Sequence, residues 1–246
     1  DSLNTDFVLA RYNSNGTFDQ NFGRNGVIFA SLGISDDTAT SVLIQPDGKI
    51  IVAGITANGP YSSFANLRYN ADGSPDKSFG NNGISVLPAY NMMNFPTASV
   101  LQPDGKILSI GYGVMNSGRD IILWRCNNNG TPDLSFGTDG RVVKDIGTFS
   151  DKAYGVALQK DGKILVAGSS ANESFIDFTL TRFNADGVPD ISFGKAGVVK
   201  TPIGSSFDYA RCVAVLSDGK IVAAGYSKNE LGTMDFAVVR YLGQLK

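Results

Sequence analysis

Short apolar runs separated by turn residues follow one another along the whole chain, and no window shows a helical period. The most frequent pair of runs flanks an Asp-Gly dipeptide, as in VLIQPDGKIIVAGIT at residues 42–56. Asp-Gly between two apolar runs predicts a two-residue β-hairpin turn with positive φ. The run after the turn is apolar on consecutive residues, which indicates a strand covered on both faces.

The same phrase occurs four times at a fixed interval of 57 residues, at Lys49, Lys106, Lys163 and Lys220. Three further series keep this interval: Arg11, Arg68, Arg125 and Arg182, with Arg240 one residue late; Asp19, Asp76, Asp133 and Asp190; and Phe22, Phe79, Phe136 and Phe193. Internal repetition of this kind marks a repeat architecture.

Each repeat supplies four strand candidates, which we call A to D. A and B flank the Asp-Gly turn, C ends in the repeated Arg, and D follows a glycine. Units of more than 50 residues with four antiparallel strands are typical of β-propeller blades. We therefore predict an all-β chain in a single β-propeller domain, residues 1–246, with repeat units 6–63, 64–119, 120–176, 177–234 and a partial unit 235–246.

The phrases QPDGKIIVAG and RYNADGSPDKSFGNNG resemble the bacterial delta-60 repeat, and this resemblance covers essentially the whole chain. The resemblance implies a β-propeller fold and an extracytoplasmic setting, in a large secreted or surface protein. The family offers no established enzymatic activity and no known binding residues that could be transferred to this chain.

The order of strands suggests how a ring would close. Strands C and D come first, at residues 6–13 and 26–31, then complete blades at 38–88, 95–145 and 152–202, then A, B and C. These are seventeen strands, one more than four blades of four need. We expect four blades, with a closing blade that joins A and B from the C-terminus to D from the N-terminus. Five blades stay open as an alternative if residues before Asp1 supply another A–B hairpin.

The amino-acid composition of the chain excludes several classes of function. Histidine is absent, which excludes Ser-His-Asp triads and His-ligated zinc. The net charge of −2 and the pI of about 5.1 lack the basic character of a nucleic-acid binder. No run of about 18 apolar residues is present, so we expect no membrane span. Cys126 and Cys212 are too few for a disulfide framework, and we expect them not to be bonded to each other.

The repeated Arg stands eight residues before the repeated Asp. We interpret the two as structural ion pairs, since a buried Arg needs such a partner, rather than as an anion clamp. The predicted pairs are Arg11–Asp19, Arg68–Asp76, Arg125–Asp133 and Arg182–Asp190.

The loops between B and C and between D and A differ from repeat to repeat and should share one face, where a rigid scaffold usually carries its binding residues. They contain aromatic and methionine residues that either form a stacking surface for a sugar or peptide or fill a channel as local core. The candidate ligand-binding residues are Tyr61, Tyr90, Met92, Phe95, Phe149, Phe207 and Tyr209.

One repeat position just before strand A always carries a side-chain oxygen: Asp37, Asn94, Asp151 and Asp208. Four such side chains around an axis could hold a hard cation such as Ca²⁺, or each could fix its own turn.

Three functions are compatible with these features. The first is a non-enzymatic recognition or adhesion module, outside the bacterial cytoplasm, that binds a surface glycan or a protein. The second is a calcium-dependent hydrolase or lactonase that uses the four oxygen-bearing residues. The third is a passive spacer. We favour the first, with no required cofactor and no nucleic acid, and with other domains or another copy of the chain as further partners.

Overall fold

The computed structural model describes residues 5–33, 35–88, 92–115, 118–147, 149–204 and 207–242. These residues form seventeen β-strands in four sheets and contain no helix that is long and apolar enough to cross a bilayer. The predicted all-β class and the four strands of each repeat are confirmed.

The contacts within the chain define two compact units, which are described separately. Unit 1 comprises residues 1–109 and 125–133, and unit 2 comprises residues 110–124 and 134–246. Strands β8 and β9 run from one unit into the other.

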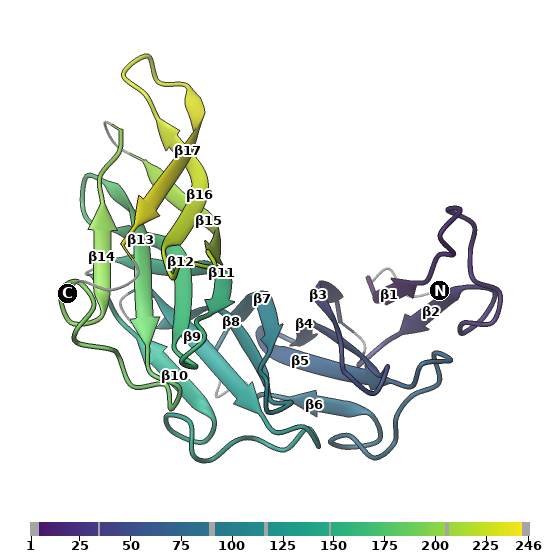
Figure 1. Cartoon of the computed structure of the whole chain (residues 1–246). Helices are drawn as coiled ribbons and strands as arrows, with labels where there is room; N and C mark the ends of the chain where they lie inside the picture. Colours follow the sequence, from purple (N-terminus) through teal and green to yellow (C-terminus); the bar gives the residue numbers. More distant parts are fainter. Residues whose placement is uncertain are drawn as a thin grey trace. The chain divides into compact units, whose positions relative to one another are not determined.

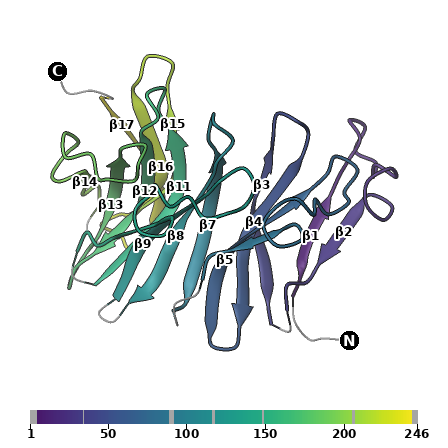
Figure 2. The ribbon, with the colours of Figure 1, turned by 90° about the horizontal axis from the view of Figure 1, so that it is seen from below.

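Unit 1 begins with a two-stranded antiparallel sheet, β1 (Phe7–Ala10) and β2 (Val27–Ala30). The next sheet has four strands in chain order: β3 (Asp37–Ile44), β4 (Ile50–Asn58), β5 (Tyr61–Tyr69) and β6 (Ile84–Val86). Figure 2 shows β3, β4 and β5 side by side. Side chains of both sheets meet in one core, made of Phe7, Phe22, Ile50, Val52, Ala65, Leu67 and Tyr69.

The second complete blade segment supplies β7 (Asn94–Leu101), β8 (Ile107–Met115), β9 (Gly118–Cys126) and β10 (Arg141–Lys144). The third supplies β11 (Ser150–Leu158), β12 (Ile164–Ala171), β13 (Ile176–Phe183) and β14 (Val198–Thr201). A single parallel pair, Ser150 with Arg119, joins these strands into one eight-stranded sheet.

Unit 2 ends with a three-stranded sheet whose strands lie side by side in Figure 1: β15 (Asp208–Val215), β16 (Ile221–Lys228) and β17 (Met234–Tyr241). It packs on the β11–β14 strands through a core of Leu165, Ala167, Phe178, Leu180, Phe193, Ala210, Ile221 and Ala223.

The predicted closed ring of four blades is not found. Among the described strands, β1 pairs only with β2, and β17 pairs only with β16. The strand β2 keeps the partner that is its neighbour in sequence, because a local hairpin closes a short loop and loses less chain entropy than a pairing between the two ends of the chain. The sheet β15–β17 therefore lacks the fourth strand that β6, β10 and β14 supply in the other repeats.

The A–B turn also differs from the predicted two-residue hairpin. Gly48 N–H donates to the Gln45 carbonyl, so Pro46 and Asp47 occupy the centre of a four-residue turn, and Gly48 follows with a φ of 83°. In all four repeats the backbone N–H of the Lys after the glycine donates to the Asp carboxylate of the turn. This contact favours a three-residue loop, made of a type I turn followed by a glycine with positive φ. The other three repeats have the same geometry, with positive φ at Gly105, Gly162 and Gly219.

Candidate functional site

The repeated Arg and Asp form the four expected pairs. The Nε–Oδ2 distances are 2.9 Å for Arg11–Asp19, 2.8 Å for Arg68–Asp76, 2.7 Å for Arg125–Asp133 and 2.8 Å for Arg182–Asp190. The last three pairs are buried, whereas the first is partly exposed.

Two of the pairs, those of Arg11 and Arg68, belong to connections between successive repeats. The Arg68 guanidinium lies 4.6 Å from the centroid of the buried Phe79 ring and donates through Nη1 to the carbonyl of Asn128 in the next repeat. Gly80 N–H donates to the Asn129 carbonyl beside it. Arg11 makes the same contacts with Phe22 and with the carbonyl of Ala71. Through these contacts Arg11 and Arg68 link successive repeats, and their N–H donors bond to groups within the protein.

The four residues proposed for a cation are all buried, and each binds nearby backbone. Asp37 accepts from Leu32 N–H at 2.7 Å, Asp151 accepts from Ile146 N–H at 2.6 Å, and Asp208 accepts from Ile203 N–H at 2.8 Å. Asn94 donates to the Ser62 carbonyl at 2.9 Å. The bonds of Asp37, Asp151 and Asp208 match the alternative in which the side chain fixes the turn before strand A, whereas Asn94 bonds to strand β5.

A different acidic group forms in unit 2 around one of them. Asp120, Asp145 and Asp151 each place a carboxylate oxygen within 4.8 Å of the others. Burial, together with the charges of Asp145 and Asp151, raises the pKa of the Asp120 carboxyl. Carboxylate oxygens at this spacing are the ligand type that Ca²⁺ prefers. This trio is the candidate for a cation among the described residues, with only Asp151 shared with the predicted set.

The predicted ligand-binding residues are divided between the two units, with Tyr61, Met92 and Phe95 in unit 1 and Phe149, Phe207 and Tyr209 in unit 2. Tyr61 and Phe149 are exposed, Met92, Phe95, Phe207 and Tyr209 are half-buried, and Tyr90 lies outside the described residues. Phe207 has the Lys228 ammonium 5.1 Å from its ring centroid, and Tyr209 packs on Tyr226 with the ring centroids 4.9 Å apart.

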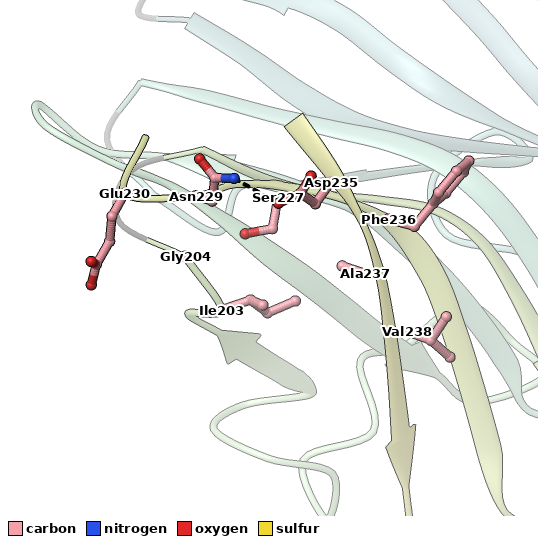
Figure 3. A pocket seen from close by; sticks show the side chains of 9 residues that line it. All are labelled: Ile203, Gly204, Ser227, Asn229, Glu230, Asp235, Phe236, Ala237 and Val238. Carbon is pink, nitrogen blue, oxygen red and sulfur yellow. Dashed lines mark hydrogen bonds between the residues drawn. The ribbon is translucent and has the colours of Figure 1, made fainter. Parts of the chain in front are cut away.

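A pocket of about 650 Å³ lies in unit 2 between β17 and the loop before β15. Its lining residues, all labelled in Figure 3, are Ile203, Gly204, Ser227, Asn229, Glu230, Asp235, Phe236, Ala237 and Val238. Ala237 points toward Ile203, whereas Phe236 points to the other side of β17 and is almost fully exposed (Figure 3). Asn229 donates to Asp235 at 2.7 Å and to Thr233 at 2.6 Å. These bonds close the β16–β17 hairpin on itself and engage the Asn229 amide within it, whereas the Glu230 side chain in the same lining is exposed.

The A strands carry a β-bulge at one repeat position. Register shifts separate Ala39 from Ser41, Ala153 from Gly155, and Ala210 from Cys212. The extra residues are Thr40, Tyr154 and Arg211. A bulge redirects the side chain of its extra residue and often adjoins functional sites.

In unit 2 the two bulge residues meet. The Arg211 guanidinium lies 4.2 Å from the centroid of the Tyr154 ring and 5.3 Å from that of Tyr226, and Arg211 Nη2 donates to the Tyr226 hydroxyl at 3.3 Å. Beside them, the Lys152 ammonium lies 5.4 Å from the centroid of the Tyr112 ring. We call this group the tyrosine–cation array; its members are Tyr112, Arg119, Lys152, Tyr154, Tyr209, Arg211 and Tyr226.

The array concentrates positive charge in an acidic protein. Burial lowers the pKa of the Lys152 ammonium, and the nearby charges of Arg119 and Arg211 lower it further. Burial also raises the pKa of the Tyr154 hydroxyl. Arg119 and Arg211 are exposed, while Lys152 and the four tyrosines are half-buried. A hydrogen bond with the buried Ser169 engages the Tyr154 hydroxyl.

Of the residues in the array, only Tyr209 was predicted from the sequence as a ligand-binding residue. A signal for the others was present in the alternation along two A strands, where Lys152 and Tyr154 flank the buried Ala153. Tyr209 and Arg211 flank the buried Ala210 in the same way. Residues two apart share one face of a strand, so this pattern marks a polar and aromatic face.

A family model described as "Domain of unknown function (DUF5122) beta-propeller" matches residues 3–22, 45–79, 102–136, 159–193 and 216–243, which is more than half of the chain. No curated protein matches the sequence.

Among solved structures, a protein of unknown function from Dyadobacter fermentans superimposes with a TM-score of 0.58 at 13% identity, over 84% of this chain and 54% of that one. An α-L-arabinofuranosidase from Clostridium thermocellum gives 0.40 at 15% identity, over 79% and 62%. A mannose phosphorylase from Leishmania mexicana gives 0.39 at 15% identity, over 82% and 61%. The chain thus spans less than two thirds of the length of each, and the first similarity supports the β-propeller-like fold.

Proposed function

The chain belongs to the DUF5122 β-propeller family, and from this premise we propose that it is a non-enzymatic recognition module that binds a glycan through the tyrosine–cation array. The observation that carries the proposal is the stacking of Arg211 against Tyr154 and Tyr226, at the bulge of one A strand and beside the bulge residue of the preceding one.

The chemistry of the array suits carbohydrate. Tyrosine offers an apolar ring that packs on the C–H face of a sugar and a hydroxyl that bonds to sugar hydroxyls. Every side chain in the array ends in a polar group.

The delta-60 resemblance gives the proposal its setting. Within the DUF5122 family, we propose that these repeats are of the delta-60 kind and that the module acts outside the cytoplasm, as part of a secreted or cell-surface protein. The partner is then a surface or extracellular polysaccharide.

A panel of immobilised neutral and acidic polysaccharides tests the proposal. We expect at least one class to bind, and Tyr154→Ala to weaken that binding by at least about fivefold, as loss of a central contact of ~1 kcal/mol does. Tyr12→Ala is the matched control, since Tyr12 is 58% exposed but lies outside the array. Absence of binding to every polysaccharide, or an equal loss with Tyr12→Ala, contradicts the proposal.

A further inference from the structure

We propose that the sugar units recognised by the array carry carboxylate groups, so that the ligand is an acidic polysaccharide of the uronic-acid class; this inference rests on the proposed function. Arg119, Lys152 and Arg211 are the residues that recognise the negative charge.

The first argument is the lack of acidic partners. None of the ion pairs formed within the described part of the chain involves Arg119, Lys152 or Arg211. The cations of the repeat motif behave differently, since Arg68 and Lys49 both reach Asp76, at 2.8 and 2.9 Å. The protein thus pairs the cations of its repeat motif internally, whereas these three have no acidic partner among the described residues.

The second argument is the geometry of Arg211. Its planar guanidinium lies near two tyrosine rings, and the described bonds of this group use one donor, Nη2, toward the Tyr226 hydroxyl. A guanidinium has five N–H donors, and stacking leaves those at its edge directed outward. Two parallel N–H donors at that edge match the two oxygens of a carboxylate.

The positive charges of Arg119, Lys152 and Arg211 lie close enough to act on one another. Arg119 and Arg211 both act on Lys152, and burial already disfavours the charged ammonium there. Three cations held together repel one another, and an anion bound among them removes that repulsion. The β-bulge places Arg211 in this position, since the register shift between Ala210 and Cys212 turns the extra residue out of the regular ladder.

The tyrosines of the array favour an acidic glycan over an acidic peptide as the ligand. The four tyrosines, Tyr112, Tyr154, Tyr209 and Tyr226, surround the cations with ring faces and hydroxyls. A sugar acid presents a carboxylate, a C–H face and hydroxyls at once, and each of these finds a matching group in the array.

The test uses polygalacturonate and its fully methyl-esterified form, which share a backbone and differ in charge. In calorimetric titrations at 50 mM NaCl, we expect the acid to bind and the ester to bind at least about tenfold more weakly, as loss of a charge-assisted contact does. Affinity for the acid should fall when the salt is raised to 200 mM.

Substitutions of Arg211 test whether its positive charge recognises the carboxylate of the ligand. Arg211→Gln should weaken binding of the acid at least about tenfold, and Arg211→Lys should weaken it less, because it keeps the charge and loses only the planar donor pair. Lys77→Gln is the matched control, since Lys77 is exposed and lies outside the array. Thermal melts check that each variant is folded; Arg211 is exposed, so its replacement leaves the core intact.

The outcomes are distinct. Equal binding of acid and ester overturns this inference and leaves the proposed function standing, as does an Arg211→Gln variant that binds like Lys77→Gln. Failure to bind any polysaccharide overturns both. Tighter binding of poly-glutamate than of polygalacturonate overturns the assignment to carbohydrate.

Discussion

The guanidinium of Arg211 lies 4.2 Å from the centroid of the Tyr154 ring, and the two residues occupy the same bulge position in successive repeats. The contact depends on the close approach of β11 and β15. Gly155 provides that approach, because a Cβ atom added there would lie 2.8 Å from the Cα of Cys212.

Gly155→Ala should therefore push β15 away from β11. We expect a lower free energy of unfolding, by about 1–3 kcal/mol, as for other overpacked sites, measured by urea denaturation. Gly33→Ala is the control, since nothing lies within 4 Å of the position and its φ is not positive. Equal stability of the two variants would show that the strands do not approach so closely.

Asp76→Ala should destabilise unit 1 by about 3 kcal/mol, because it leaves the buried Arg68 guanidinium without its carboxylate. Asp19→Ala removes the equivalent partner of Arg11, where the two side chains are 34% and 22% exposed, and should cost about 1 kcal/mol. Chemical denaturation compares the two. An Asp76→Ala protein as stable as the parent contradicts a structural role for the repeated pair.

The Arg68–Asp76 pair should make the stability of the protein depend on pH. Burial alone would raise the pKa of the Asp76 carboxyl, but hydrogen bonds from Ser78 and Lys49 and the charge of Arg68 outweigh it and hold the pKa well below its usual range. A depressed folded-state pKa stabilises the fold at pH values above the unfolded pKa of about 3.9. As the pH falls below that value, the parent protein should lose stability and the difference from Asp76→Ala should shrink.

Asp120→Asn should raise the melting temperature at pH 7 in the presence of EDTA. The pKa of Asp120 is raised by burial and by Asp145 and Asp151, so its charged form is disfavoured in the folded state. A raised carboxyl pKa destabilises the fold as the pH rises through it, and amidation removes that effect. Asp177→Asn, at the same repeat position but with Pro202 in place of Asp145, should change the melting temperature less. A lower melting temperature for Asp120→Asn contradicts this account.

The two cysteines should differ in reactivity. Cys126 is fully buried, and its burial raises the thiol pKa to about 12, whereas Cys212 is exposed; both are free. Iodoacetamide at pH 8 should modify Cys212 in the folded protein and Cys126 only after unfolding, because the thiolate is the reactive form. Mass spectrometry of tryptic peptides reads out both sites, and early modification of Cys126 would contradict the burial of β9.

Local sequence was enough for the strands and the ion pairs. The apolar runs, the glycine turns and the eight-residue spacing from Arg68 to Asp76 act within one repeat, so they could be read without knowing how repeats meet. The A–B turn was predicted less well, because Asp-Gly suits both a two-residue loop and a three-residue loop that ends in glycine. The hydrogen bond that the Asp47 carboxylate accepts from Lys49 N–H favours the longer loop.

The array could not be predicted from the same signals. It arises where β8, β11 and β15 come together, and the distance from Lys152 to Tyr112 depends on strands that are far apart in sequence. The prediction of a closing blade was wrong for a related reason. A count of strands shows which pairings are possible, but not which pairing loses the least chain entropy.

The most direct test of the account is a ¹³C–¹H spectrum of tyrosine-labelled protein, recorded with and without polygalacturonate. Four of the nine tyrosines belong to the array, and their signals can be assigned by single Tyr→Phe replacements. The account predicts that the ring signals of Tyr112, Tyr154, Tyr209 and Tyr226 shift on titration, while those of Tyr12, Tyr69 and Tyr241 stay unchanged. Shifts confined to the latter three, or none at saturating polysaccharide, would contradict it.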